Sequence, residues 1–323
     1  MILTVTLNAA LDVTYEVDGL VPNSSHRVRA VHQRAGGKGV NVARVLAALD
    51  AEVLVTGLIG GGAGAEIADD LSRAGIPARF GAIEGTSRRT VTIVSGDATV
   101  FNEPGPAVTA EEWRRFRGLF RELCRDARVV VLSGSLPPGL APDAYAELTE
   151  DARTEGARVL LDADHEALRL GLAARPDIAK PNAAELARAA GPGPVEEAAR
   201  RLLAVGPAAV VVSRGPDGLL GVTPDGSWAV RPPRRLSGNP TGAGDAVAAA
   251  LARALHSPGR STGRAPSPTR PRCRPPPSSP RSPGTSTRPP TAPSCRRSHA
   301  PRHDRLDSRR RARRSVRVQR HHP

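Results

Sequence analysis

Lysine, cysteine and aromatic residues are all scarce in this sequence. It holds two lysines (Lys38 and Lys180) against 44 arginines, three cysteines, and eight Phe, Trp and Tyr residues together. Three cysteines without metal-binding spacing exclude a disulfide framework and a cysteine metal site, and they fit a reducing cytoplasm. No run of 18 apolar residues occurs, which argues against a membrane-spanning helix. The first residues lack the basic segment and cleavage site of a signal peptide.

The excess of positive charge is confined to the end of the sequence. Residues 257–323 contain 18 Arg, 14 Pro, two acidic residues and no Phe, Trp or Tyr, whereas residues 1–256 contain 28 basic and 30 acidic residues. A segment so poor in apolar residues cannot bury a core, so we expect 257–323 to be a disordered basic tail. No aromatic residue interleaves with its arginines, so the sequence predicts no specific nucleic-acid binding by this tail.

The composition of the tail also suggests a changed reading frame. Pro and Arg codons shifted by one base encode Ala, Ser, Thr or Pro, and a permitted choice of third bases turns residues 265–293 into a globular helix pattern. We hypothesise that the frame is lost between Leu251 and Ala265, which predicts a chain of reduced stability and weak activity. The coding DNA tests this: the hypothesis is refuted if no single insertion or deletion restores a helix.

Residues 1–256 alternate short apolar runs with helical patterns. Near-continuous apolar runs of this kind are typical of strands buried on both faces of a parallel sheet. The alternation therefore predicts an α/β fold with a doubly wound, mostly parallel sheet. The expected strands are 2–7, 53–59, 129–133, 159–162 and 209–213, and the expected helices are 39–49, 63–74, 110–125, 142–155, 195–205 and 246–255.

Two regions interrupt this rhythm. Residues 12–34 and about 89–103 alternate polar with apolar side chains, which indicates exposed antiparallel strands. We expect them to form a small β lid over the edge of the main sheet.

The segment Asn239-Pro-Thr-Gly-Ala-Gly-Asp245 directly precedes a helical run. Gly242, Ala243 and Gly244 expose backbone N–H groups at a helix N-terminus, which is a ready anion-binding site. Asp245 lies in the same first turn, where a carboxylate can accept a proton from an attacking hydroxyl while the amides hold a phosphoryl group. An ordinary capped helix start explains the same residues about equally well.

Glycines also surround one of the two lysines, in the segment Arg34-Ala-Gly-Gly-Lys-Gly-Val-Asn41. They allow a close approach of the backbone to a ligand, which Lys38 and Asn41 can reach from the start of a helix. The spacing is not that of a P-loop. A flexible turn between strand and helix is the structural alternative, and we favour ligand contact.

The other lysine belongs to Lys180-Pro-Asn-Ala-Ala-Glu185. Asn182 and Glu185 have the spacing of a helix capping box. The same pair also suits outer ligands of a Mg²⁺ ion that carries phosphates. Weaker signals are the turn Ser133-Gly-Ser-Leu-Pro137, the segment Ser213-Arg-Gly-Pro-Asp-Gly218 and Arg88 with Arg89. Asp162 and Asp164 end a strand, and either lie near a site or turn the chain.

Together these motifs resemble the pfkB-type carbohydrate kinases of the ribokinase superfamily, in the family's order over nearly all of residues 1–256. The branch that acts on phosphorylated hexoses, 1-phosphofructokinase and tagatose-6-phosphate kinase, is the most similar. The residues that carry the resemblance are Thr6-Leu-Asn-Ala-Ala-Leu-Asp12, Gly36-Gly-Lys-Gly-Val-Asn41, Phe101-Asn-Glu-Pro-Gly-Pro106, Ser133-Gly-Ser-Leu-Pro137, Lys180-Pro-Asn182, Ser213-Arg-Gly215 and Gly242-Ala-Gly-Asp245. Ala9 departs from the family's usual Pro, and the Pro/Arg tail stands where the family continues with ordered elements.

The resemblance implies a ribokinase-like fold and ATP-dependent phosphorylation of a hexose phosphate, with fructose 1-phosphate as the first choice. Asp245 would be the catalytic base and Gly242, Ala243 and Gly244 the anion hole. The implied sugar-phosphate contacts are Asp12, Gly37, Lys38, Asn41, Arg88 and Ser135. The implied nucleotide contacts are Lys180, Asn182, Ser213, Gly215, Gly218 and Thr241. Asn182 and Glu185 would contact Mg²⁺ indirectly, through water or phosphate.

The resemblance also implies a cytoplasmic enzyme without membrane attachment, and a homodimer formed through the lid. Two alternatives stay open at this point. One is a kinase-fold remnant with impaired catalysis, and the other is a kinase of tagatose 6-phosphate or fructose 6-phosphate.

Overall fold

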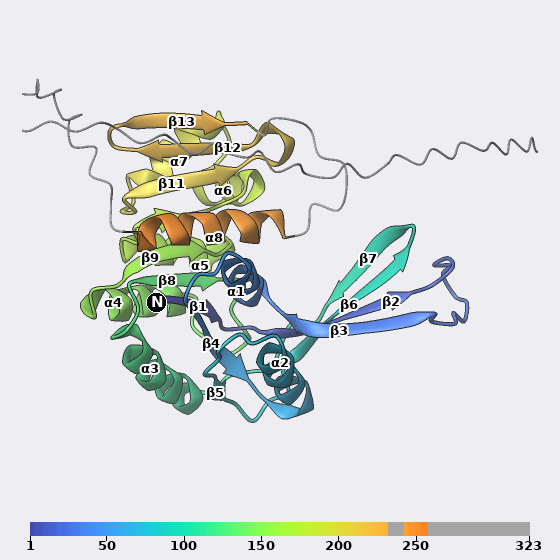
Figure 1. Cartoon of the computed structure of the whole chain (residues 1–323). Helices are drawn as coiled ribbons and strands as arrows, with labels where there is room; N and C mark the ends of the chain where they lie inside the picture. Colours follow the sequence, from blue (N-terminus) through green and yellow to red (C-terminus); the bar gives the residue numbers. More distant parts are fainter. Residues whose placement is uncertain (232–241, 258–323) are drawn as a thin grey trace, which may run out of the picture. The chain divides into compact units, whose positions relative to one another are not determined.

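The computed structural model describes residues 1–231 and 242–257. The described residues belong to one compact unit, Met1–Gly263 (Figure 1). Thr241 and the tail beyond Ser257 lie outside the described residues. Residues 258–265, which belong to the region proposed for the frame change, also lie outside them.

The main sheet has nine strands in the order β13-β12-β11-β10-β9-β8-β1-β4-β5. Pairing is parallel from β5 to β11, and the last two pairs, β11–β12 and β12–β13, are antiparallel. The strands are β1 (Ile2–Thr6), β4 (Val53–Ile59), β5 (Gly81–Ala82), β8 (Val129–Ser133), β9 (Arg158–Asp162), β10 (Ile178–Ala179), β11 (Ala209–Ser213), β12 (Leu219–Thr223) and β13 (Gly226–Val230).

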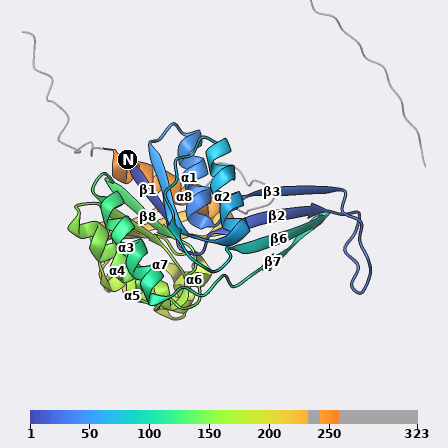
Figure 2. The same cartoon turned by 90° about the horizontal axis from the view of Figure 1, so that it is seen from below.

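Helices cover both faces of this sheet (Figure 2). Side chains of the central strands alternate between two apolar clusters: Val130 and Leu132 of β8 belong to one, and Val129 and Val131 to the other. The first cluster is completed by α3 (Ala110–Cys124), α4 (Ala144–Thr154), α5 (His165–Ala173), α6 (Ala183–Ala190) and α7 (Val195–Leu203). The second is completed by α1 (Lys38–Ala48), α2 (Gly61–Arg73) and α8 (Ala243–His256).

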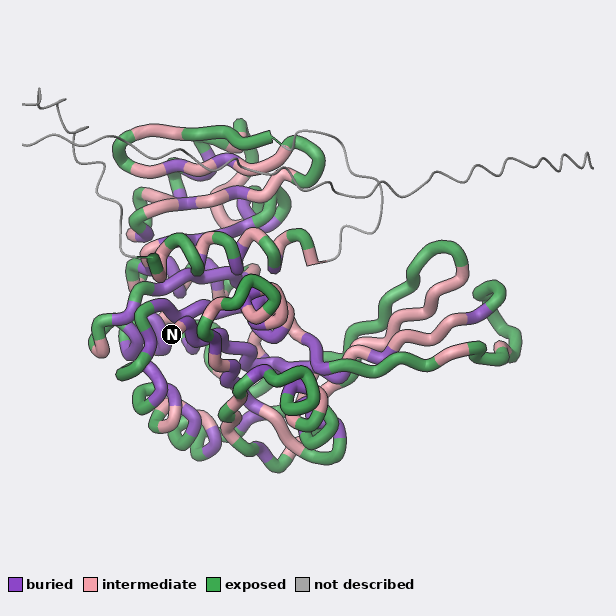
Figure 3. The backbone as a smooth tube through the Cα atoms, in the orientation of Figure 1, coloured by how far each residue is buried: buried purple, intermediate pink, exposed green. Residues whose placement is uncertain are grey.

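The second sheet has four strands in the order β3-β2-β6-β7, which are β2 (Ala10–Glu16), β3 (Ala30–Gly36), β6 (Arg88–Ser95) and β7 (Asp97–Asn102). The pairs β2–β3 and β6–β7 are antiparallel, whereas β2 and β6 pair in parallel. Every residue of β7 is exposed, in contrast to the buried β1 (Figure 3). This sheet is the lid that alternation predicted, with a parallel central pair that alternation did not predict.

The predicted fold class is confirmed: an α/β structure with a large, mostly parallel sheet and a small β lid. Helix α8 begins three residues earlier than the expected 246, because the turn at Gly242 leads straight into it. The expectations omitted α5, the two-residue strands β5 and β10, and the hairpin β12–β13. No helix among the described residues is long and apolar enough to cross a membrane.

Candidate active site

Four polar side chains stand where neighbouring strands of the main sheet end. Ser133 ends β8, Asp162 ends β9, Lys180 directly follows β10, and Ser213 ends β11. Because these strands are parallel neighbours, their carboxyl ends lie along one edge of the sheet, which is where open α/β sheets bind ligands. A further bridge joins the backbones of Ser213 and Asn182 at this edge.

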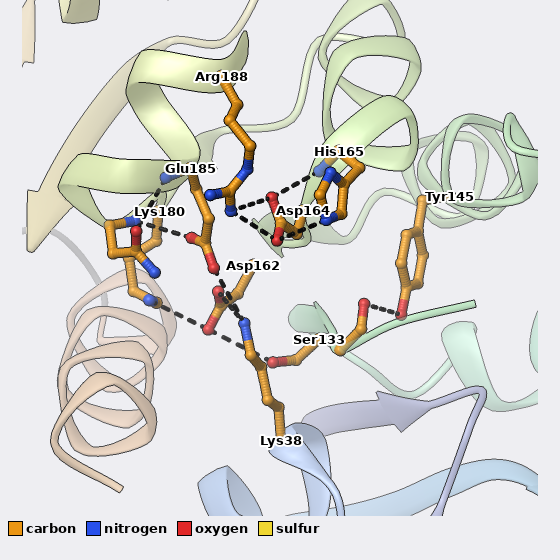
Figure 4. A network of polar contacts seen from close by, with 11 residues as sticks. Lys38, Ser133, Tyr145, Asp162, Asp164, His165, Lys180, Glu185 and Arg188 are labelled. Atoms are coloured by element: carbon orange, nitrogen blue, oxygen red, sulfur yellow. Dashed lines mark hydrogen bonds and ion pairs between the residues drawn. The ribbon is translucent and has the colours of Figure 1, made fainter. Parts of the chain in front are cut away.

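Asp162 is the centre of a polar network at this edge (Figure 4). Its Oδ2 lies 3.1 Å from Nζ of Lys180 and accepts a hydrogen bond from Ser133 Oγ at 3.5 Å. Its Oδ1 lies 3.4 Å from Nζ of Lys38. The Asp162 and Lys180 side chains are 1% and 4% exposed, so this pair is removed from water and each charge depends on its partner.

Glu185 joins the same network from the first turn of α6. It forms a reciprocal capping box with Asn182: the Asn182 N–H donates to Glu185 Oε2 at 2.8 Å, and the Glu185 N–H donates to Asn182 Oδ1 at 2.9 Å. Its other oxygen, Oε1, lies 3.6 Å from Lys38 Nζ. The capping role that the spacing predicted is present, and it leaves one carboxylate oxygen of Glu185 facing the cluster.

Asp245 is buried in the first turn of α8, beside the same two lysines. Burial raises the pKa of this carboxyl and nearby Asp162 adds to the rise, while a hydrogen bond with Asn41 and the charges of Lys38 and Lys180 oppose it. The N-cap Gly242 has φ +86°, a left-handed conformation that glycine adopts without strain, and among the described residues no side chain caps the helix. The first N–H groups of α8 are therefore available to an anion.

Gly244 brings the α8 turn close to the network of Asp162. A Cβ atom added at Gly244 would lie 3.7 Å from Nζ of Lys180. The glycine-rich turn, the two lysines and Asp245 therefore share one small region. Such a set can hold a phosphoryl group between amides and ammonium groups with a carboxylate beside it.

The base of the lid carries a second group of charged residues. A Cβ atom at Gly36 would overlap the carboxylate of Asp12, so any larger residue would displace this side chain. Burial raises the pKa of Asp12, and Arg34, Thr90, Arg88 and Arg44 oppose that rise. Gly37, with φ +102°, is the N-cap from which Lys38 starts α1.

Arg88 lies at the start of β6, on the lid side of this group. Its Nε donates to the backbone carbonyl of Asn8 at 3.2 Å and its Nη1 donates to Thr90 Oγ1 at 3.2 Å. Burial lowers its pKa, and the charges of Asp12 and Glu103 oppose the shift. The guanidinium is held in place by neutral acceptors and retains donors for an anion.

Asn8 is a site residue that sequence reasoning did not single out. Its Nδ2 donates to Ser135 Oγ at 3.2 Å and to the carbonyl of Pro104 at 3.0 Å, whereas its Oδ1 is buried without a partner among the described residues. It thus ties the end of β1 to the β8 turn and to the segment that leaves the lid. Its place in Thr6-Leu-Asn-Ala-Ala-Leu-Asp12 was the available signal.

The expected nucleotide contacts are brought together only in part. Lys180 and Asn182 belong to the network, and Ser213 pairs with Asn182 through the backbone. Gly215 and Gly218 lie farther along, on the 3₁₀ turn Gly215–Asp217 and its end, with φ +55° and +80°. Thr241 is outside the described residues.

The donor set suits a magnesium ion that is held mainly by other ligands. Among the described residues no group of three or more His, Cys, Asp and Glu could hold a metal. Asp162 and Glu185, however, each direct one oxygen at the same cation, the Lys38 ammonium. Mg²⁺ is typically bound by one or two carboxylates, waters and substrate phosphates, so this pair fits such an ion.

Comparison with known proteins identifies the family. The model of the pfkB family carbohydrate kinases matches residues 5–263. The chain belongs to this family. It is therefore a sugar kinase, a phosphotransferase with an alcohol group as acceptor, and the resemblance given by its motifs is confirmed.

Solved structures of family members superpose over most of the chain. Phosphofructokinase-2 from Escherichia coli, in its tetrameric inhibited form, is 30% identical with a TM-score of 0.75, covering 79% of this chain and 86% of the other. The same enzyme in complex with fructose-6-phosphate is 30% identical with a TM-score of 0.73, covering 79% of this chain and 86% of the other. A Thermotoga maritima protein described as a possible 1-phosphofructokinase is 26% identical with a TM-score of 0.73, covering 81% and 87%.

Proposed function

We propose that this protein transfers the γ-phosphoryl group of ATP to a hydroxyl of a hexose phosphate, with fructose 1-phosphate as the preferred substrate and fructose 1,6-bisphosphate as the product. The observation that carries the proposal is the placement of Asp245. A buried carboxylate lies in the first turn of a helix whose N-terminus has no side-chain cap among the described residues, beside two lysines. Phosphoryl transfer needs a base, an anion hole and cations in this arrangement.

Asp245 would accept the proton of the attacking hydroxyl. Its pKa is raised by burial, which makes it a better base than an exposed Asp. The N–H groups at Gly242, Ala243 and Gly244 would hold the transferring phosphoryl group, and Lys180 would balance its charge from beside Gly244. These groups are already in place, so little reorganisation is required during transfer.

The lid base would hold the sugar phosphate. Asp12 is an acceptor for sugar hydroxyls, and Arg88, with Arg34 nearby, supplies the positive charge that a phosphorylated sugar requires. Ser135, fixed by Asn8, and Asn41, which lies near Asp245 and lowers its pKa, complete the set together with Gly37 and Lys38.

Magnesium, when bound with ATP, would neutralise phosphate charge during transfer. Asp162 and Glu185 are the carboxylates available to it, with Asn182 reaching it through water or phosphate. Lys180, Asn182, Ser213, Gly215, Gly218 and Thr241 are proposed to contact the nucleotide.

The lid is proposed to join two copies of the chain. The lid strands expose half or more of three large apolar side chains, Val31, Val100 and Phe101. Exposed apolar side chains gathered on one small sheet are typical of an interaction surface. The E. coli phosphofructokinase-2 structure described above is a tetramer. A second copy of this lid is the partner proposed here.

A second substrate, fructose 6-phosphate, is favoured by the superposition on E. coli phosphofructokinase-2 in complex with that sugar. The decisive experiment is ADP release from ATP and Mg²⁺ with fructose 1-phosphate, fructose 6-phosphate, tagatose 6-phosphate and unphosphorylated fructose in parallel. We expect the highest kcat/KM with fructose 1-phosphate and negligible turnover with fructose. A preference for fructose 6-phosphate would correct the substrate, and no ADP from protein that melts cooperatively would contradict the kinase activity.

A further inference from the structure

Lys38 bridges the two carboxylates that are available to a metal ion. Its Nζ lies 3.4 Å from Oδ1 of Asp162 and 3.6 Å from Oε1 of Glu185 (Figure 4). The two carboxylates come from different elements, the end of β9 and the first turn of α6, and both are nearly inaccessible to water. The ammonium therefore occupies a position between two buried oxygens that attract any cation.

The two lysines of the chain are held differently. Lys180 is 4% exposed and pairs with the other oxygen of Asp162 at 3.1 Å, so its removal would leave the buried Asp162 with only the longer ion pair to Lys38. Lys38 is 40% exposed, and its contacts to Asp162 and Glu185 are longer. The Gly134 backbone beside it has no side chain, and even a Cβ there would be 3.9 Å from Lys38 Cβ. Lys38 has room to adopt another rotamer, whereas Lys180 has little.

A divalent cation and an ammonium group cannot both occupy the space between the same two oxygens, because they repel each other at such distances. Lys38 starts α1 directly after the glycines at the base of the lid, so a displaced side chain remains beside the residues that are proposed to hold the sugar. We propose that Lys38 and the divalent cation brought by the nucleotide compete for the Asp162–Glu185 pair, and that cation binding releases Lys38 to the phosphorylated sugar.

This inference rests on the proposed function and adds a coupling between its two substrate sites. The metal–nucleotide complex frees a cation that the sugar phosphate requires, so each ligand tightens the binding of the other. The effect is reciprocal, because a coupling free energy belongs to the pair of ligands. Lys38 would thus act twice, as a substitute cation before nucleotide binding and as a phosphate ligand after it.

The first test measures Mn²⁺ binding to the full chain by electron paramagnetic resonance, without nucleotide or sugar. Lys38→Met removes the competing ammonium, so we expect Mn²⁺ to bind about fivefold more tightly, or better, than to the wild type. Arg188→Met is the matched control, because Arg188 pairs with Asp164 at 2.8 Å and not with Asp162 or Glu185. Equal or weaker Mn²⁺ binding by Lys38→Met, including no detectable binding by either protein, would overturn the proposal.

The second test measures the coupling by calorimetry with fructose 1-phosphate. The sugar phosphate should bind the wild type several-fold more tightly when Mg²⁺ and a non-hydrolysable ATP analogue are present, and Lys38→Met should show no such gain. If Lys38→Met fails to fold by circular dichroism, the uncharged Lys38→Gln replaces it in both tests. Tighter Mn²⁺ binding without any binding of fructose 1-phosphate would support the competition and contradict the proposed substrate, whereas an equal gain in wild type and variant would refute the coupling.

Discussion

The two sheets of this protein bury their side chains in different ways. In the nine-stranded sheet all five residues of β1 are buried, and neighbouring side chains enter apolar clusters on opposite faces, each completed by helices. In the four-stranded lid all six residues of β7 are exposed, and Phe101 is 54% exposed. The main sheet carries most of the apolar core, to which the lid adds the base of β2 and β3, whereas β7 at the lid edge presents apolar side chains to its surroundings.

This difference separates stability from substrate recognition. The free energy of folding arises from burial in the main sheet and its helices, because burial of apolar area is the dominant favourable contribution. The residues proposed to hold the sugar, such as Asp12 and Arg88, lie on lid strands at the junction with the core. Changes in the core should therefore alter unfolding, and changes in the lid should alter association or substrate binding.

The largest effect is expected from the core aromatic Phe120. It is fully buried on α3 and stacks with Phe116, so Phe120→Ala should lower the free energy of unfolding by about 3–5 kcal/mol. Phe101→Ala, on the lid, should change it by less than about 0.5 kcal/mol, and should shift sedimentation toward smaller species. Urea unfolding measures the change in stability, and analytical ultracentrifugation measures the change in sedimentation. Equal destabilisation by both substitutions would contradict the peripheral place given to β7.

A large effect is also expected where the core meets the site. Asp162→Ala should lower the free energy of unfolding by about 3 kcal/mol. The substitution removes the carboxylate that lies 3.1 Å from Nζ of the buried Lys180. Asp164→Ala is the control two residues away: it loses an ion pair with the half-exposed Arg188 and a cap on α5, and should cost about 1 kcal/mol. Urea unfolding compares them, and a smaller loss for Asp162→Ala than for Asp164→Ala would contradict the central place given to Asp162.

A smaller effect on stability, with a marked one on binding, is expected at Gly36. Gly36→Ala introduces a Cβ that overlaps the Asp12 carboxylate, so the KM for the hexose phosphate should rise about tenfold and stability should fall by about 1–3 kcal/mol. Gly62→Ala, in the open on α2, should leave KM unchanged and slightly raise the melting temperature. Steady-state kinetics measure both variants. A KM of Gly36→Ala equal to that of the wild type would refute this account of Gly36.

The sequence predicted the main sheet better than its irregular parts. Strands β4, β8 and β11 have the predicted bounds, because continuous β-branched runs leave little choice of structure. Helix α5 was missed because it is short and follows directly on Asp162-Ala-Asp164, with His165 at a positive φ of 52°. The two-residue β10 is defined by its neighbours rather than by its own composition.

The same limit applies to the site. Motifs indicated Lys38, Lys180 and Glu185 separately, each with a structural alternative, but nothing local indicated that Asp162 joins the two lysines. Lys38 and Asp162 are 124 positions apart, so their contact depends on how α1 packs against β1, β4 and β8 of the main sheet. Local patterns predict caps and turns, whereas a contact of this kind depends on the complete tertiary fold.

The most direct measurement compares ADP release and melting temperature for the wild type and Asp245→Asn. The raised pKa means that ionised Asp245 destabilises the folded state. This destabilisation disappears when the pH falls below the pKa of an Asp in the unfolded chain, about 3.9. Asn avoids the cost, so the variant should melt at the same or a higher temperature at pH 7. Its rate should nevertheless fall about 100-fold or more, since it cannot accept a proton.

The pH dependence of the wild type adds a second readout to the same experiment. Its kcat/KM should fall as the pH decreases through the pKa of Asp245, at a pH above 3.8, because only the ionised carboxylate is a base. Loss of turnover with unchanged or increased stability is the predicted result. An Asp245→Asn variant that keeps more than about a tenth of the wild-type rate would contradict the assignment of Asp245 as the base.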